Sequence, residues 1–198
     1  MSYKQTYTER IHESIQLKQA ILHDEPLLDT IDNVVEASVQ TLQQDGKILF
    51  CGNGGSASDA QHLAAELTGR FYLDRKPLDA EALHVNTSAL TAGANDYGYD
   101  ETLARVLEAK GRKGDILFAL STSGSSQSIL NALHKANDLK MTTVGLTGNE
   151  EAAMDALCGY ILKVPSTKTP RIQECHIMLG HLICECIEKH MFAESPYS

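Results

Sequence analysis

The chain has 198 residues, of which 42% are hydrophobic and 22% charged, values typical of a globular protein with a substantial core. Its formal net charge of −9 disfavours a nucleic-acid partner, because binding a polyanion normally requires a positive surface that neutralises phosphates. The sequence contains no apolar run approaching the roughly twenty residues of a membrane span, and its first residues do not resemble an export signal. We therefore expect no membrane partner and a cytoplasmic location.

Cysteine usage also suits the cytoplasm. The five cysteines form no CxxC pair and lie mostly in apolar stretches: Cys51, Cys158, Cys175, Cys184 and Cys186. We expect reduced thiols that serve as packing residues.

Two amphipathic helices are predicted first, over about residues 3–22 and 27–43. From Lys47 onward, short apolar strands alternate with helices. Strands are predicted at 47–51, 80–85, 115–121, 142–148 and 160–164, and helices at 57–69, 100–110, 126–139, 150–158 and about 171–192. This alternation predicts one α/β domain over 1–198 with a parallel sheet, helices on both faces, and an N-terminal helical extension over about 1–45. The closing helix is apolar over much of its circumference, which is typical of a helix between subunits.

Two of the predicted strands end in loops that suit phosphate binding. The first loop, "CGNGGSAS", combines Gly52, Gly54 and Gly55 with Asn53 and Ser56. The second, "STSGSSQS", surrounds Gly124 with five hydroxyl side chains: Ser121, Thr122, Ser123, Ser125 and Ser126. Hydroxyls and helix N–H groups at the carboxyl end of a parallel sheet favour a phosphomonoester. Neither loop has Walker A or G-x-G-x-x-G spacing, and ordinary N-capped turns are the alternative.

Two predicted helices carry groups suited to proton transfer or metal binding. His62 and Glu66 are four residues apart, so they share one helix face. In the closing helix, Gln173 and His181 lie about two turns apart. Taken separately, each feature has an ordinary explanation. His62 and Glu66 would form a surface ion pair, and His181 would be a hydrogen-bonded core histidine. If the helices meet, the four side chains offer a ligand set for a zinc-like ion.

These motifs together resemble the bacterial phosphoheptose isomerases of the sugar isomerase (SIS) superfamily. The resemblance is carried by "CGNGGSASDAQHLAAELTGRF", "NDYGYDE", "LSTSGSSQSI", "LTG" and "RIQECHIMLGH", and it covers nearly the whole chain. It implies a flavodoxin-like SIS domain and a homotetramer with active sites at subunit interfaces. The implied reaction converts D-sedoheptulose 7-phosphate to D-glycero-D-manno-heptose 7-phosphate through an enediol, the first step toward ADP-heptose for lipopolysaccharide.

The resemblance also assigns roles to residues. Glu66 matches the catalytic base and His181 the catalytic acid. One zinc ion per subunit is implied, with His62, Glu66, Gln173 and His181 as its ligands. Substrate contacts are implied for Asn53, Gly54, Gly55, Ser56, Glu66, Asp96, Ser121, Thr122, Ser123, Ser126 and Gln173. Arg70 and Arg171 have no settled role, and Pro170 stands where the family form has an acidic residue.

Two rival functions belong to other classes. A non-enzymatic SIS tetramer of the DiaA type, which binds the replication initiator DnaA, resembles the chain throughout but lacks the glutamate and the second histidine. The presence of Glu66 and His181 favours the enzyme. A sugar-phosphate-sensing regulator would need a DNA-binding domain, for which this acidic chain has no room.

Overall fold

The computed structural model describes residues 2–192. The predicted domain over 1–198 thus includes residue 1 and residues 193–198, which lie outside the described part. Five parallel strands form one sheet in the order β2-β1-β3-β4-β5: β1 (Ile48–Gly52), β2 (Ala80–Ala82), β3 (Ile116–Leu120), β4 (Thr142–Thr147) and β5 (Tyr160–Lys163). This is the flavodoxin-like order, so the predicted fold class is confirmed.

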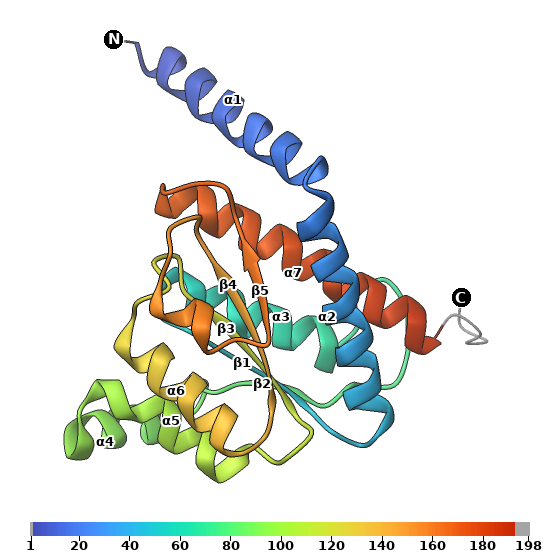
Figure 1. Ribbon diagram of the computed structural model, residues 1–198, viewed down its shortest axis with the longest axis vertical. Coiled ribbons are helices and arrows are strands. Elements are labelled where there is room, and N and C mark those ends of the chain that lie inside the picture. Colours follow the sequence, from blue (N-terminus) through green and yellow to red (C-terminus); the bar gives the residue numbers. More distant parts are fainter. Residues whose placement is uncertain (1, 193–198) are drawn as a thin grey trace.

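Helices cover both faces of the sheet (Figure 1). Alternate residues of β1 point to opposite sides, so Ile48 and Phe50 enter one apolar cluster and Leu49 and Cys51 the other. The first cluster lies under α2 (Glu25–Gln43), α3 (Gly55–Thr68) and α7 (Thr169–Phe192). The second lies under α5 (Tyr99–Lys110) and α6 (Gln127–Asp138). Burial on both faces explains why these strands are continuous apolar runs.

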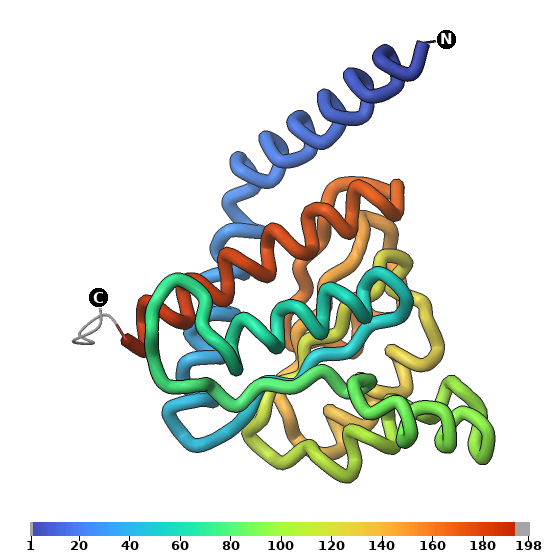
Figure 2. Tube along the Cα trace, turned by 180° about the vertical axis from the view of Figure 1, so that it is seen from behind, coloured from blue at the N-terminus to red at the C-terminus, as the bar shows by residue number. Residues whose placement is uncertain are grey.

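The predicted helices α3 and α7 lie side by side on the first face (Figure 2). They are in close contact at Gly180, where an added Cβ would lie 2.5 Å from Cδ1 of Leu63. A side chain at this position of α7 would therefore force Leu63 or the two helices to move. The contact places Leu63 and Gly180 opposite each other, and their chain neighbours are His62 and His181.

Two regions differ from the sequence prediction. A helix α4 (Thr87–Tyr97) precedes α5 and was not predicted, because its Ala-, Gly- and Thr-rich sequence buries no residue and shows no apolar stripe. The start of α4 could have been predicted, because Asn86 is a typical N-cap residue whose side chain accepts a hydrogen bond from the Ala89 N–H. The helix predicted at 150–158 is a single 3₁₀ turn, η1 (Ala153–Ala156).

Helix α1 (Tyr3–Leu22) projects from the body of the domain (Figures 1 and 2). Its buried residues are Leu17 and Ile21, both near its C-terminal end. Large apolar side chains on the projecting part are exposed: Tyr3, Tyr7, Ile11 and Ile15. The first helix therefore presents an apolar surface that residues 2–192 of one chain leave uncovered.

All five cysteines are free thiols. Cys51, Cys175 and Cys184 are buried as packing residues, and burial raises the pKa of the Cys51 and Cys184 thiols to about 12. Cys186 is exposed and does not act as a core residue. Within residues 2–192, no helix combines the length and the apolar character that crossing a bilayer requires.

Candidate active site

The two loops that were predicted to bind phosphate follow the neighbouring strands β1 and β3. β1 and β3 pair in parallel register, with Gly52 opposite Leu120, so both loops leave the same edge of the sheet. Gly54 has φ 56° and stands at the N-cap of α3, a conformation that favours glycine. The first turns of α3 and α6 thus direct their N–H groups toward this edge, where the positive ends of both helix dipoles lie.

The hydroxyl groups of the second loop are not used as helix caps. Ser126 occupies the N-cap position of α6, but its side chain makes no capping hydrogen bond within the described chain. Its Oγ instead lies 3.5 Å from the Oγ of the buried Ser121, and Ser125 Oγ donates to Ser123 Oγ at 3.1 Å. Gly124 turns the loop with φ 63°. Ordinary N-capping therefore does not explain this hydroxyl cluster.

Asn53 in the first loop is held by two hydroxyl side chains. Its Nδ2 donates to Ser128 Oγ at 2.9 Å, and its Oδ1 accepts from the Tyr99 hydroxyl at 2.7 Å. One amide hydrogen of Asn53 remains free to donate to a ligand. The role of Tyr99 was missed from the sequence, although the residue lies inside the quoted motif "NDYGYDE".

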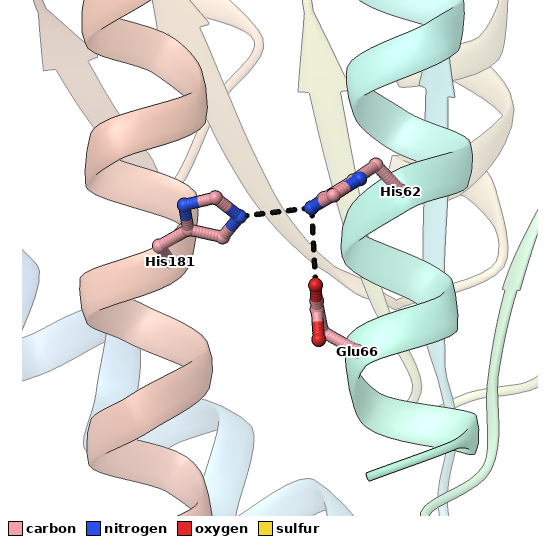
Figure 3. A group of neighbouring side chains, drawn as sticks. All are labelled: His62, Glu66 and His181. Atoms are coloured by element: carbon pink, nitrogen blue, oxygen red, sulfur yellow. Dashed lines mark hydrogen bonds and ion pairs between the residues drawn. The ribbon is translucent and has the colours of Figure 1, made fainter. Parts of the chain in front are cut away.

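Helices α3 and α7, which carry the residues predicted to transfer protons or bind a metal, bring three side chains together (Figure 3). His62 Nε2 lies 3.0 Å from Glu66 Oε1 on α3 and 2.9 Å from Nε2 of His181 on α7. The His62 side chain is 52% exposed and that of Glu66 21%, so solvent and a small ligand reach the group. A carboxylate and two imidazoles at this spacing can exchange protons with a ligand or bind a cation.

These three side chains fit a zinc ion by donor type and spacing. Each offers one ligand atom, and the three atoms lie within 4.8 Å of one another. Two ligands on a tetrahedral zinc ion are about 3.3 Å apart, because each lies about 2.0–2.1 Å from the metal. The amide of Gln173 lies beside Gly55, where an added Cβ would be 2.8 Å from its Oε1. Gly55 is about two helical turns before His62 on α3. The role of Gln173 as a fourth ligand therefore stays a prediction.

A second carboxylate approaches the cluster from the preceding turn of α3. Burial raises the pKa of Asp59, an effect opposed by the nearby imidazoles of His62 and His181. One carboxylate oxygen, Asp59 Oδ2, is buried and has no hydrogen-bond partner among the described residues. In the sequence Asp59 precedes His62 by three residues, and this helical spacing could have identified Asp59 as a neighbour of the cluster.

The remaining residues that the sequence singled out lie on or beside three different helices. Asp96 is exposed at the C-terminal end of α4, which packs on α5 beneath the opposite face of the sheet (Figure 1). Arg70 is exposed just after α3. Arg171 contacts α1 through the carbonyl oxygen of Arg10. Pro170 is the second residue of α7, a position that needs no N–H donor and suits the fixed φ of proline.

Comparison with known proteins gives consistent relatives over most of the chain. Residues 9–148 match the family model described as SIS domain. The chain is 52% identical over 180 residues to a phosphoheptose isomerase of Helicobacter pylori strain P12, covering 87% of this chain and 94% of the relative. A phosphoheptose isomerase of Clostridium acetobutylicum is 46% identical over 185 residues, which cover 93% of this chain and 94% of the relative.

Solved structures agree with these relatives. The phosphoheptose isomerase GmhA of Neisseria gonorrhoeae superposes with a TM-score of 0.88 at 41% identity, covering 95% of this chain and 100% of the other. A phosphoheptose isomerase of Francisella tularensis superposes with a TM-score of 0.91 at 34% identity, covering 96% and 100%. The similarity therefore extends over nearly all of this chain.

Proposed function

The chain belongs to the phosphoheptose isomerase family of SIS-domain proteins, and from this we propose that it converts D-sedoheptulose 7-phosphate to D-glycero-D-manno-heptose 7-phosphate. The observation that carries the proposal is the meeting of His62, Glu66 and His181 on the helix face that follows the first loop. Family membership supports the isomerase class, and the cluster supplies the groups that the reaction needs. The product is the first intermediate toward ADP-heptose in the proposed pathway.

Substrate binding is proposed to begin at the phosphate. The second loop offers the hydroxyls of Ser121, Thr122, Ser123 and Ser126 together with the N–H groups at the start of α6. Charge-assisted hydrogen bonds to a phosphate are stronger than bonds between neutral groups, so they would anchor one end of the sugar. The first loop, with Asn53, Gly54, Gly55 and Ser56, would hold the sugar hydroxyls.

Isomerisation moves a proton between C1 and C2. In the proposed mechanism Glu66 removes a proton from C1 of the ketose, while His181 donates a proton to the carbonyl oxygen at C2. The resulting enediol takes up a proton at C2 from Glu66 and loses its O1 proton to His181, which gives the aldose. Both groups return to their starting protonation states.

A zinc ion is proposed at the same cluster, held by His62, Glu66, Gln173 and His181. Zinc when bound there would polarise the substrate oxygens as a Lewis acid. Glu66 and His181 would then serve both as ligands and as proton carriers. Metal analysis of protein purified without chelator, together with activity before and after chelation, tests the ligand set.

A homotetramer with active sites between subunits is also proposed. Two exposed features support it: the apolar side chains of the projecting part of α1, and α4, which buries no residue within the chain. Asp96, the predicted substrate contact on α4, would belong to such a shared site. Sedimentation velocity gives the oligomeric state directly. The five free thiols support a cytoplasmic location for the enzyme.

The DiaA-type alternative is not favoured. The relatives described above are named phosphoheptose isomerases, and Glu66 and His181, the proposed base and acid, are both present.

The test is an isomerase assay with D-sedoheptulose 7-phosphate alongside a panel of other ketose phosphates. We expect preferred turnover of the seven-carbon substrate, and loss of that turnover in Glu66→Gln, which keeps the side-chain volume but removes the base. Retention of full activity by Glu66→Gln would reject Glu66 as the base. Equal turnover of shorter sugars would reject the substrate assignment.

A further inference from the structure

A buried carboxylate near the end of α7 organises the segment that follows α3. Glu188 is 1% exposed, and its two oxygens accept three consecutive backbone N–H groups. Phe71 N–H donates to Oε1 at 3.2 Å, while Tyr72 and Leu73 N–H donate to Oε2 at 2.8 and 3.0 Å. Three bonds to one carboxylate fix the backbone of residues 71–73 against α7.

Arg75 completes this buried group. Its Nε donates to Glu188 Oε1 at 2.9 Å, and its side chain is 0% exposed. Its Nη1 also donates to the carbonyl oxygens of Leu67, Gly69 and Lys76, and its Nη2 donates to that of Glu66, at 2.8–3.1 Å. Because the two charges pair with each other and with backbone groups of both segments, the Arg75–Glu188 pair joins the end of α3 to the end of α7.

The segment of residues 71–73 places an aromatic ring on His181, which belongs to the cluster of His62, Glu66 and His181. The ring of Phe71 stacks on the imidazole of His181, with centroids 5.6 Å apart and an interplanar angle of 26°. His62 contacts the same imidazole at 5.1 Å and 58°. The His181 ring thus contacts both Phe71 and His62, and its Nε2 faces His62 (Figure 3).

We propose that Phe71 is a positioning residue, which holds the His181 imidazole with its Nε2 toward His62 and Glu66. The χ2 torsion of histidine is broad and roughly two-fold, so the helix backbone alone does not set the ring orientation. A stacked aromatic ring restricts that freedom, and the backbone that carries the Phe71 ring is itself held by Glu188. This inference rests on the proposed function, since it concerns the acid of that reaction.

Phe71→Leu is the decisive variant. It removes the stacked ring but leaves the backbone N–H groups that bind Glu188, so folding is preserved. We expect kcat to fall roughly three- to tenfold, the range for losing one aromatic contact, with KM within about twofold because the phosphate loop is untouched. Phe71→Tyr keeps the ring and should restore kcat. A crystal structure of Phe71→Leu should show the His181 ring rotated or in two orientations.

Phe192→Leu is the matched control. Phe192 packs on Arg75, whose guanidinium carbon lies 5.6 Å from the ring centroid, and on α7 it is about three helical turns from His181. This variant should lower the melting temperature and leave kcat unchanged. An unmoved His181 ring and wild-type kcat in Phe71→Leu would overturn the positioning role. An inactive wild-type protein would instead refute the proposed function, while the ring orientation in the crystal would still decide the role of Phe71.

Discussion

Gly180→Ala is the perturbation that tests the contact between α3 and α7 most sharply. The added methyl group would lie 2.5 Å from Cδ1 and 2.6 Å from Cδ2 of Leu63. Carbon atoms in contact are normally about 3.5–4.0 Å apart, so the two helices or the leucine must move by about 1 Å. Leu63 is 1% exposed, and the apolar cavity beside it has a volume of ≈ 10 Å³, no more than one water molecule needs. We therefore expect the helices to separate.

The expected effects on stability and on activity differ in size. Overpacking costs about 1–3 kcal/mol, and alanine in place of glycine inside a helix returns about 1 kcal/mol, so the free energy of unfolding should fall by about 1 kcal/mol. His62 and His181 neighbour the two residues that clash, so their separation should grow with that of the helices. A displacement of about 1 Å in a catalytic group can lower the rate about a hundredfold. We expect kcat to fall by that order while the protein stays folded.

The assay combines urea unfolding with steady-state isomerisation of the heptose phosphate. Leu63→Ala in the Gly180→Ala background is the rescue, because it removes both clashing methyl groups. Leu63→Ala alone should cost about 2–5 kcal/mol, and the double variant less than the sum of the two single variants. Wild-type kcat in Gly180→Ala, or no recovery in the double variant, would refute the reasoning that helix spacing sets the geometry of the cluster.

Three further results are expected. Ser123→Ala with Ser126→Ala should raise KM about a hundredfold, from two lost hydrogen bonds to a charged phosphate at about 1.5 kcal/mol each; an unchanged KM would remove these hydroxyls from the phosphate site. Tyr99→Phe loses the 2.7 Å bond to the first-loop amide and should raise KM about fivefold, whereas Tyr160→Phe at the start of β5 serves as the control. Burial lowers the pKa of His176 to about 4, so below about pH 6.5 the unfolded chain takes up a proton that the folded chain does not. The free energy of unfolding should therefore decline by up to about 3 kcal/mol from pH 6.5 to pH 4, and His176→Gln should flatten that decline.

The layered fold could be predicted from local patterns because its strands are short, apolar and separated by helical periodicity. Helix α1 (Tyr3–Leu22) agrees with its predicted bounds, and the strand order follows the flavodoxin-like arrangement. Helix α4 escaped prediction because it buries nothing, so no apolar stripe marks it. Hydrophobic periodicity reports burial, and a helix without a buried face leaves no such signal.

The candidate site was predictable in its residues and less so in its geometry. The four-residue spacing of His62 and Glu66 identifies a shared helix face, but the approach of His181 depends on Gly180, whose role appears only when α3 and α7 are placed together. The Arg75–Glu188 pair joins residues 113 apart in the sequence, and no local pattern links them. Contacts of that separation are set by tertiary packing.

The central claim is that Glu66 moves a proton at C1 and C2 of a sugar phosphate. The most direct measurement is NMR of the isomerisation of D-sedoheptulose 7-phosphate in D₂O, with wild-type protein and with Glu66→Gln. We predict that solvent deuterium enters the carbon-bound positions of the sugar pool with the wild-type protein, because a carboxylic acid exchanges its proton with water, and that Glu66→Gln gives neither deuterium nor product. Deuterium exchange or product formation by Glu66→Gln at the wild-type rate would overturn the role of Glu66 as the base.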